Sequence, residues 1–320
     1  MEELKTGKID CAIWMVTYNH AAYIRQAIDS VLAQETRYRY HIFIGDDKST
    51  DGTSDLCLEF ARKYPDTITL FTHEKNIGAS ANGVFVYLKC LASGARYTAL
   101  LEGDDFWTDS SKLEKQISLL DANPQFAGCF HDAVTINSNG ELISPSFVQM
   151  KRRLTRKDVL NFGGLFPAGS LIFRTELINR FPPELKKMYG GDRLMSMAIT
   201  GYGDLEYLDY NMSAYRLHNT GMYSTASVLV KSERQYHDFL FLNSISEYRT
   251  NYAEEIKKKL AENLSVMAFC YALQNRRRDQ WNAALAYMRV MPWKWFDIKR
   301  LLSHVLFPVM YKKFRPDTNP

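Results

Sequence analysis

The sequence has few of the features that mark several large classes of protein. Its five cysteines are scattered and form no CxxC pair, which argues against a disulfide framework and against a zinc site. No apolar run reaches the roughly 18 residues of a transmembrane helix. The phosphate-binding pattern GxxxxGK[ST] is also missing, which excludes a P-loop enzyme. What remains is a chain of 320 residues, 46% hydrophobic and 24% charged, with the composition of an ordinary soluble globular protein.

Charge is unevenly distributed, although the formal net charge is only +4. From Ala226 onward, 16 lysine and arginine residues stand against 9 acids, and the preceding part is mildly acidic. Residues 293–315 combine aromatic and basic residues with an apolar helical pattern, which is typical of segments on anionic membrane surfaces and also of self-association. We expect a peripheral membrane contact or a homo-oligomer through the C-terminal helices. We expect no nucleic-acid binding, because no recognition motif accompanies the clustered charge.

The first ten residues, MEELKTGKID, are charged and lack the apolar stretch of a secretory signal. The unpaired cysteines fit a reducing compartment. Together these features predict a cytoplasmic protein that is free or peripheral on the inner face of the cytoplasmic membrane.

Apolar segments of two periodicities alternate through the first half of the chain. Those of strand type cover residues 9–16, 41–45, 68–72, 98–101 and 126–137. Those of helical spacing cover residues 21–34, 54–63, 83–93 and 113–120. The alternation predicts βαβ units and an α/β fold with a mostly parallel sheet flanked by helices, with an edge or inserted strand at 168–174. After about Tyr223 the pattern is helical, so we predict a catalytic domain over residues 1–225 and a helical C-terminal region over 226–320.

Polar residues stand where three predicted strands end. Thr17-Tyr18-Asn19-His20 follow the first strand, Asp46-Asp47 the second, and Glu102-Gly103-Asp104-Asp105 the fourth. Ligands of parallel sheets bind beyond the carboxyl ends of the strands, so a site is expected there. Crowded carboxylates raise each other's pKa unless a cation compensates. Mg²⁺ or Mn²⁺ is such a cation, because carboxylates hold it together with phosphate oxygens of a substrate.

Each of these acidic motifs also has a purely structural interpretation. Short polar residues at a strand–helix junction commonly cap the next helix or form its turn. Candidates for this role are Thr53, Ser54, Asp109, Ser110 and Asp192. Capping leaves Glu102, Asp104 and Asp105 unexplained.

Six motifs in order resemble the family 2 glycosyltransferases of the GT-A fold, the Rossmann-like nucleotide-diphospho-sugar transferases. Over roughly residues 9–224 they are VTYNHAAYIRQAIDSVLAQ, IGDDKSTDGT, NIGASAN, LLEGDDFWTDSSKLEKQ, GGDRLMSMAITGYGDLEYLD and YRLHNTGMYS. The resemblance implies a nucleotide-sugar donor, by preference UDP-linked, and a glycan or lipid-linked glycan acceptor in cell-surface polysaccharide synthesis. One departure is that the NIGASAN segment lacks the Ala-Arg-Asn run common in the family.

The resemblance also implies a role for each matching residue. The donor would be contacted by Thr17, Tyr18, Asn19, Asp46, Asp47, Asn76, Glu102, Asp104 and Arg216, with Asp47 at the uracil ring and Glu102 at the ribose. Mn²⁺ or Mg²⁺ would be held by Asp104, Asp105 and His218. Asp192 would be the base that takes the acceptor's proton. For Trp107 the floor of a sugar site and a place in the core are both open, whereas Phe106 is expected in the core.

These roles describe an inverting, metal-dependent hexosyl transfer by a single displacement. One alternative is a sugar-phosphate nucleotidyltransferase. Enzymes of that class have a glycine-rich, arginine-containing loop after the first strand, whereas this chain has Thr17-Tyr18-Asn19-His20 there. The other is a non-catalytic nucleotide- or glycan-binding module, which would have no need of a base such as Asp192.

Overall fold

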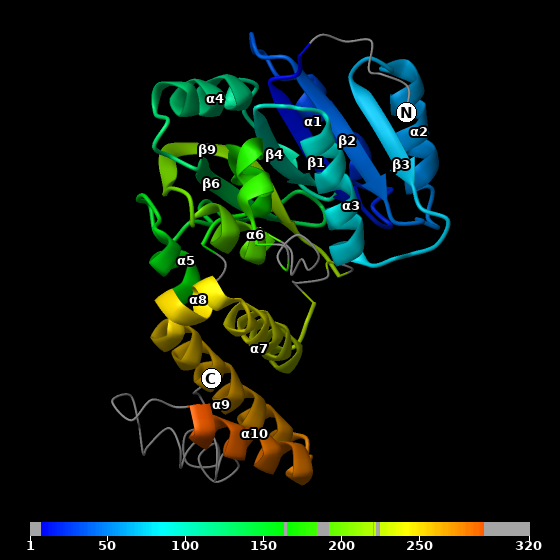
Figure 1. The fold of residues 1–320 in the computed structure, drawn as a ribbon. Coiled ribbons are helices and arrows are strands. Elements are labelled where there is room, and N and C mark those ends of the chain that lie inside the picture. The colour runs from blue at the N-terminus through cyan, green and yellow to red at the C-terminus, as the bar shows by residue number, and fades with distance from the viewer. Residues whose placement is uncertain are drawn as a thin grey trace. The chain divides into compact units, whose positions relative to one another are not determined.

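The computed structural model describes residues 8–162, 165–182, 184, 192–219, 221 and 225–290. The chain divides into two compact units, residues 1–218 and 219–320, close to the predicted boundary at residue 225. The first unit contains the sheet and the second is helical (Figure 1). The predicted membrane-surface or oligomer segment, residues 293–315, lies outside the described residues.

The first unit is built on a sheet that has nine strands within the described residues. They are β1 (Cys11–Thr17), β2 (Tyr40–Asp46), β3 (Ile68–Thr72), β4 (Tyr97–Glu102), β5 (Phe106–Trp107), β6 (Gly128–Asn137), β7 (Leu142–Ser144), β8 (Ile172–Arg174) and β9 (Leu205–Leu217). Their order is β3-β2-β1-β4-β8-β6-β9-β5, with β7 paired to β6. The four strands from β3 to β4 are parallel, and β6 is parallel to β9. The predicted α/β architecture is confirmed.

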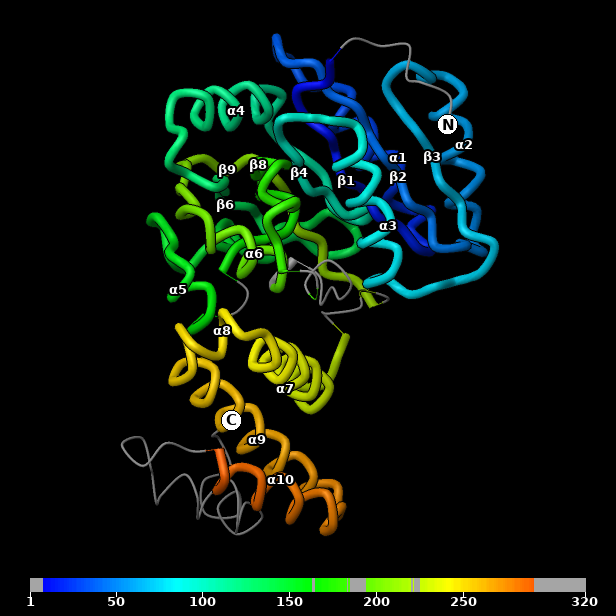
Figure 2. Tube along the Cα trace, in the orientation of Figure 1, coloured from blue at the N-terminus to red at the C-terminus, as the bar shows by residue number. Residues whose placement is uncertain are grey.

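The strand predicted at residues 168–174 is inserted into the sheet and is not an edge strand. β8 runs antiparallel between β4 and β6, so segments distant in sequence lie side by side (Figure 2). It is also shorter than predicted, because residues Ala168–Ser170 form a turn of 3₁₀-helix before it. Pairing across such long separations leaves no local signal in the sequence.

Helices cover both faces of the parallel part of the sheet. They are α1 (Ile24–Leu32), α2 (Thr53–Lys63), α3 (Ala79–Ala92) and α4 (Lys112–Ala122), and α5 (Arg156–Asn161) and α6 (Asp192–Ile199) follow. Alternate residues of β1 point to opposite faces: Ile13 and Met15 join the core under α1, α2 and α4, whereas Ala12 joins the core under α3. Burial on both faces explains why these strands are continuous apolar runs.

The predicted caps of α2 and α4 are wrong. The residue before α2 is Gly52 and the residue before α4 is Ser111, and neither makes a side-chain capping bond. Ser54 donates its hydroxyl hydrogen bond to Asp46 instead. The Asp109 carboxylate accepts from the backbone N–H of Ser111 at 2.8 Å and from the Lys115 ammonium at 2.6 Å. These side chains therefore organise the loops at the sheet edge and do not cap the N-termini of α2 and α4.

The second unit consists of α7 (Val228–Ser244), α8 (Ser246–Asn251), α9 (Ala253–Leu273) and α10 (Arg277–Val290). Small residues let α10 pack closely on α9, so Ala283, Ala284 and Tyr287 are buried. The larger row with helical spacing, Trp281, Leu285 and Met288, is exposed. Within the described residues, no helix has both the length and the apolar character needed to cross a membrane.

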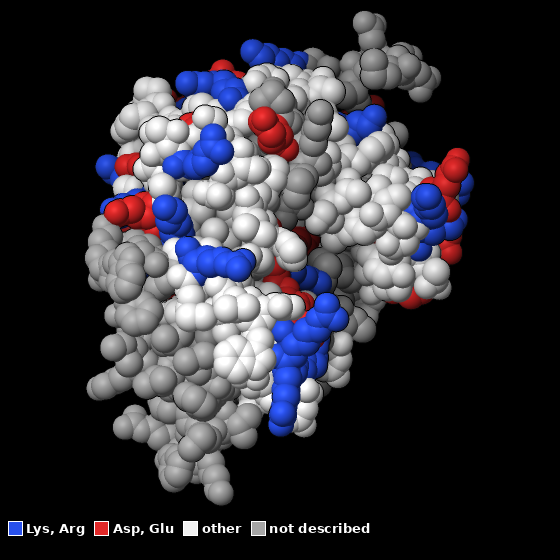
Figure 3. All heavy atoms as spheres, turned by 60° about the horizontal axis from the view of Figure 1, so that its bottom comes forward, with Lys and Arg blue, Asp and Glu red and all other residues white. Residues whose placement is uncertain are grey.

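Charged side chains of both signs are interspersed on the face of the molecule drawn in Figure 3, with broad uncharged areas between them.

Candidate active site

The carboxyl ends of β1, β2 and β4 meet at one edge of the sheet. In the parallel register Thr17 lies beside Asp46, and Val16 lies beside Glu102. The chain leaves β4 through Gly103, whose N–H donates to the carbonyl of Val16 at 2.9 Å. A Cβ on Gly103 would lie only 2.7 Å from Thr17 Oγ1, so glycine is required for this close approach. The structure thus brings the three polar motifs of the sequence together.

The turn after β1 is fastened by the loop after β2. Asn19 adopts a left-handed backbone conformation with φ of 55°, and its side-chain oxygen accepts from the N–H of Thr50 at 2.8 Å. The backbone N–H groups of this turn donate to side chains of the loop after β2. The N–H groups of Asn19, His20 and Ala21 donate to Ser49 Oγ at 2.9 Å, Thr53 Oγ1 at 2.8 Å and Asp51 Oδ2 at 2.9 Å, respectively. The Ser-Thr-Asp-Gly-Thr sequence therefore fixes the direction in which His20 leaves the turn.

His20, Asp104 and His218 form a group that could hold a metal ion. Asp104 Oδ2 lies 2.9 Å from His218 Nε2 and 3.6 Å from His20 Nε2. One ligand atom from each residue lies within 4.8 Å of the others, and the described residues contain no other such group. The three side chains come from the end of β1, the end of β4 and the residue after β9. All are largely buried, with exposed side-chain fractions of 16%, 18% and 3%.

The electrostatics of this group favour a bound cation. Burial raises the pKa of Asp104, but the hydrogen bond with His218 and the charge interaction with His20 outweigh it, and the pKa lies below its usual value. Burial lowers the pKa of His20, although Asp104 opposes this. At neutral pH an ionised carboxylate therefore faces the neutral His20 imidazole, and these are the protonation states that bind divalent metals.

Asp105 and Arg216 lie in the framework behind the metal group. Asp105 is 3% exposed, and its Oδ1 accepts from the backbone N–H of Arg216 at 2.7 Å. Burial, together with Asp104 and Glu102, raises its pKa well above the usual value. The guanidinium of Arg216 donates to the Asp104 carbonyl at 3.0 Å and to Gln26 Oε1 at 2.8 Å. Of the predicted ligands, the structure thus groups Asp104 and His218 with His20, and places Asp105 elsewhere.

Asp46 and Asp47 are both buried and both hydrogen-bonded within the chain. Asp46 accepts from the Ser49 hydroxyl at 2.5 Å and from Ser54. The two oxygens of Asp47 accept from the N–H groups of Ile77 and Gly78, at 2.7 and 2.9 Å. Asp46 therefore holds the start of α2 and the loop before it, and Asp47 holds the loop that leads into α3. Exposed Asn76 also accepts from the Gly78 N–H, at 3.0 Å.

The other predicted donor contacts differ in exposure. Tyr18 is 42% exposed, whereas Thr17 is buried and its hydroxyl has no hydrogen-bond partner within the described residues. Glu102, the last residue of β4, is partly buried. Thr17 is thus a buried polar group beside the metal group that a ligand could satisfy.

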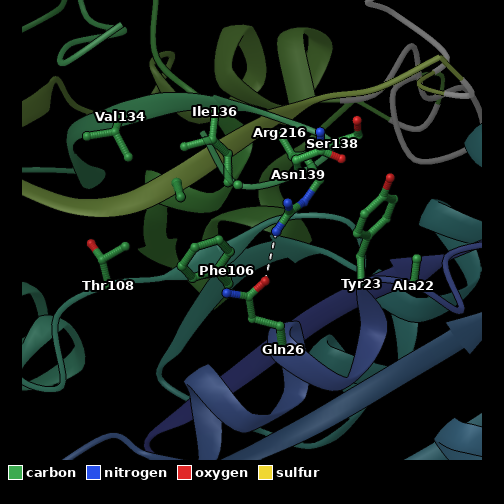
Figure 4. A pocket seen from close by; sticks show the side chains of 12 residues that line it. Ala22, Tyr23, Gln26, Phe106, Thr108, Val134, Ile136, Ser138, Asn139 and Arg216 are labelled. Atoms are coloured by element: carbon green, nitrogen blue, oxygen red, sulfur yellow. Dashed lines mark hydrogen bonds between the residues drawn. The ribbon is translucent and has the colours of Figure 1, made fainter. Parts of the chain in front are cut away.

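Of the two aromatic residues of β5, Trp107 takes the core place, one of its two open alternatives, and Phe106 is not in the core, contrary to expectation. Trp107 is 4% exposed and donates its indole N–H to the Gly169 carbonyl at 2.9 Å. The Nζ atom of Lys112 lies 4.0 Å from the centroid of its ring. Phe106 faces a pocket of about 510 Å³ on the α1 side of the sheet (Figure 4). Other residues that line this pocket are Tyr23, Gln26, Ile136, Asn139 and Arg216. Trp107 is a core residue, and Phe106 is the ring that a ligand could touch.

Asp192 is the first residue of α6, and its side chain lies outside the described part of the chain. His20 is the residue that the sequence analysis did not assign. Its position directly after a strand, in TYNH, was the available signal.

Comparison with protein families decides the class of this site. Residues 12–180, just over half of the chain, match the family model for glycosyl transferase family 2. The chain belongs to glycosyl transferase family 2. The matched residues include the carboxyl ends of β1, β2 and β4, where the candidate site lies.

The chain is also similar in sequence to an uncharacterized protein and in fold to two solved structures. The chain is 32% identical over 218 residues to the uncharacterized protein Rv1520 of Mycobacterium tuberculosis. The aligned region covers 67% of this chain and 61% of Rv1520, so the chain spans less than two thirds of the length of that relative. The fold is similar to Staphylococcus aureus TarS 1-349 in complex with UDP-GlcNAc, with TM-score 0.62, 16% identity and coverage of 93% and 84%. It is also similar to the Pyrobaculum calidifontis mannosyltransferase PcManGT in complex with GDP-Man and Mn²⁺, with TM-score 0.52, 14% identity and coverage of 97% and 82%.

Proposed function

We propose that this chain is an inverting, metal-dependent hexosyltransferase that moves a sugar from a UDP-sugar to a hydroxyl group of a glycan or lipid-linked glycan. The observation that carries the proposal is the group of Asp104, His20 and His218 at the carboxyl end of the sheet. It stands beside two loops, after β1 and β2, that leave Tyr18 exposed and the Thr17 hydroxyl without a partner in the described residues.

The donor is proposed to lie across the ends of β1, β2 and β4. Thr17, Tyr18 and Asn19 would flank the base, with Asp47 and Asn76 beside it, and Glu102 would reach the ribose. The solved structure of TarS contains UDP-GlcNAc and that of PcManGT contains GDP-Man with Mn²⁺, so a nucleoside diphosphate with Mn²⁺ or Mg²⁺ fits this class of fold. A bound divalent ion would neutralise the diphosphate and make it a better leaving group.

The reaction is proposed to be one in-line displacement. The acceptor oxygen forms a bond to the anomeric carbon while the bond from that carbon to the diphosphate oxygen breaks, and the electron pair leaves with the nucleoside diphosphate. Asp192 takes the proton of the acceptor hydroxyl, because an ionised carboxylate can act as a base at neutral pH. A single displacement inverts the configuration at the anomeric carbon.

The setting proposed is assembly of a cell-surface polysaccharide, with the acceptor at the inner face of the cytoplasmic membrane. The basic C-terminal region would supply a peripheral membrane contact or a contact between copies of the chain. The charge excess after Ala226 supports this part of the proposal.

The test is a panel of UDP-, GDP- and dTDP-sugars with Mn²⁺, scored by slow donor hydrolysis, which needs no acceptor. We expect one UDP-sugar to be hydrolysed well above the others, and hydrolysis to stop on chelation. A flat response across the panel would contradict the proposal. Once an acceptor is known, Asp192→Asn should lower kcat by about 10³-fold or more while UDP affinity with Mn²⁺ stays within about threefold.

A further inference from the structure

We propose that His20 is a metal ligand, and that the two imidazoles of His20 and His218 make the site selective for Mn²⁺, or another first-row transition ion, over Mg²⁺. This inference rests on the proposed function and deepens it, because it names the residue that determines which ion the enzyme uses. The metal ligands predicted from the sequence lie in the segment after β4 and at His218, and none lies in the turn after β1.

The distance between His20 and Asp104 fits shared coordination of one ion better than a direct hydrogen bond. His20 Nε2 and Asp104 Oδ2 are 3.6 Å apart, which is too long for a hydrogen bond. Two ligands of one ion at about 2.1 Å each lie about 3 Å apart when they are adjacent and about 4 Å apart when they are opposite. The separations of 2.9 and 3.6 Å from Asp104 lie in or near that range. A small movement of the imidazoles brings all three ligand atoms, now within 4.8 Å of one another, onto one ion.

His20 is also held in place by contacts that do not involve Asp104. Its backbone N–H donates to Thr53 Oγ1 at 2.8 Å, and Asn19 before it is locked in the left-handed conformation by Thr50. The Nδ1 atom of His20 is buried and has no hydrogen-bond partner within the described residues. The imidazole is therefore positioned by the main chain and is not committed to another internal bond.

His218 is oriented from the opposite side. Its ring packs on Tyr23, with ring centroids 5.0 Å apart, and meets His20 edge to face at 6.0 Å. Three separate segments thus bring one ligand atom each to the same place, where together they would hold an ion. Preorganised ligands of this kind cost little conformational entropy when the ion binds.

The donor atoms decide the metal. Mg²⁺ takes oxygen ligands in a near-ideal octahedron and keeps several waters, whereas imidazole suits transition ions. A site with two imidazoles and one carboxylate therefore binds Mn²⁺ in preference to Mg²⁺. The preference should weaken when an imidazole is removed and should move toward Mg²⁺ when an oxygen ligand replaces it.

The test is Mn²⁺ titration of the full chain without nucleotide, followed by electron paramagnetic resonance of free Mn²⁺, with Mg²⁺ as competitor. For the parent we expect Mn²⁺ to bind at least about 30-fold more tightly than Mg²⁺. For His20→Gln we expect Mn²⁺ affinity to fall about tenfold or more, with Mg²⁺ affinity within about threefold. For His20→Asp the ratio of Mn²⁺ affinity to Mg²⁺ affinity should fall further, because an oxygen ligand replaces the imidazole. His73→Gln, which changes a histidine bonded to Asn82 Oδ1, is the matched control and should keep the parent ratio.

Two outcomes separate this inference from the proposed function. If His20→Gln and His20→Asp both keep the parent ratio of Mn²⁺ to Mg²⁺ affinity, the inference is wrong while the metal-dependent reaction stands. If Asp104→Asn also retains Mn²⁺ binding, the metal group itself is wrong and the proposed function loses its basis. Circular dichroism melting curves establish that each variant is folded.

Discussion

The ends of β2 and β4 carry the same short signature, two consecutive aspartates after an apolar strand, yet the structure uses them differently. Asp46 and Asp47 accept only hydroxyl and backbone N–H groups of their own and the next loop. Asp104 instead faces two imidazoles, while Asp105 turns back to the backbone of Arg216. An acidic pair at a strand end can therefore fasten loops or hold a ligand, and its partners decide which.

The partners differ because of how the following chain turns. After β2, Lys48 and Gly52 adopt positive φ, and the loop curls back so that its own hydroxyls reach Asp46. After β4, Gly103 passes close to Thr17, so Asp104 meets residues from β1 and from the end of β9. A local turn makes an acid structural, and a meeting of distant segments makes it available for chemistry.

The strongest test of this difference is Asp104→Asn. Removing the one carboxylate of the metal group should lower sugar transfer by about 10³-fold, or roughly 4 kcal/mol of transition-state stabilisation. The change is measured as kcat/KM with the UDP-sugar found in the panel, and Mn²⁺ binding is measured in parallel. Transfer within tenfold of the parent would remove Asp104 from the reaction.

Asp47→Ala should act on stability first. It leaves the N–H of Ile77 without an acceptor and the N–H of Gly78 with Asn76 Oδ1 alone, at a cost of about 2 kcal/mol in the free energy of unfolding. Urea unfolding followed by circular dichroism measures this loss. Asp104→Ala is the comparison, and without metal it should cost only about 1 kcal/mol, because it removes a single side-chain hydrogen bond, the one with His218 Nε2. Equal losses in the two variants would show that both pairs are structural.

Lys112, at the start of α4, gives a test through pH. Its ammonium is buried without a hydrogen-bond partner in the described residues, and burial lowers its pKa to about 7. An unfolded lysine has a pKa of about 10.4, so between pH 7 and 10 the unfolded chain binds the extra proton and stability rises with pH. Lys112→Met should therefore stabilise the protein at pH 7 by about 1–3 kcal/mol, and the gain should shrink toward pH 10.

The measurement for Lys112 is the free energy of unfolding of parent and variant at pH 7 and at pH 9.5, taken as a difference so that other titrating groups cancel. A difference that stays constant with pH would mean that the amine is not titrating in this range.

Asp105→Asn should have the smallest effect. The amide oxygen can still accept from the Arg216 N–H, and Asp105 lies outside the metal group, so the Mn²⁺ dissociation constant should stay within about threefold of the parent. The same titration as for His20 measures it. A loss comparable to that of Asp104→Asn would restore Asp105 as a ligand.

Much of this arrangement could be predicted from the sequence, because apolar runs and helical spacing are local signals. For the strand at residues 68–72 the predicted and observed bounds are the same. Asp104 and His218 lie side by side, as the family resemblance implied. His20 could not be assigned, since its direction depends on the conformation of Asn19 and on hydroxyls some 30 residues away.

Other errors have equally specific causes. β5 is only two residues long, so its sequence does not reveal which of Phe106 and Trp107 faces the core. The pairing with β9 decides it, because Trp107 lies opposite Ser213 and Phe106 opposite Ala214, which lines the pocket. In α10 two alanines, Ala283 and Ala284, are buried while larger apolar residues such as Trp281 are exposed, so side-chain size alone does not identify the buried face.

The most direct test of the central claim is calorimetric titration of UDP into the full chain, first with Mn²⁺ and then with an excess of chelator. The account predicts that UDP affinity falls by at least about tenfold when the metal is removed, and that Asp104→Asn binds UDP weakly with or without Mn²⁺. Equal UDP affinity of the parent protein in Mn²⁺ and in chelator would contradict it.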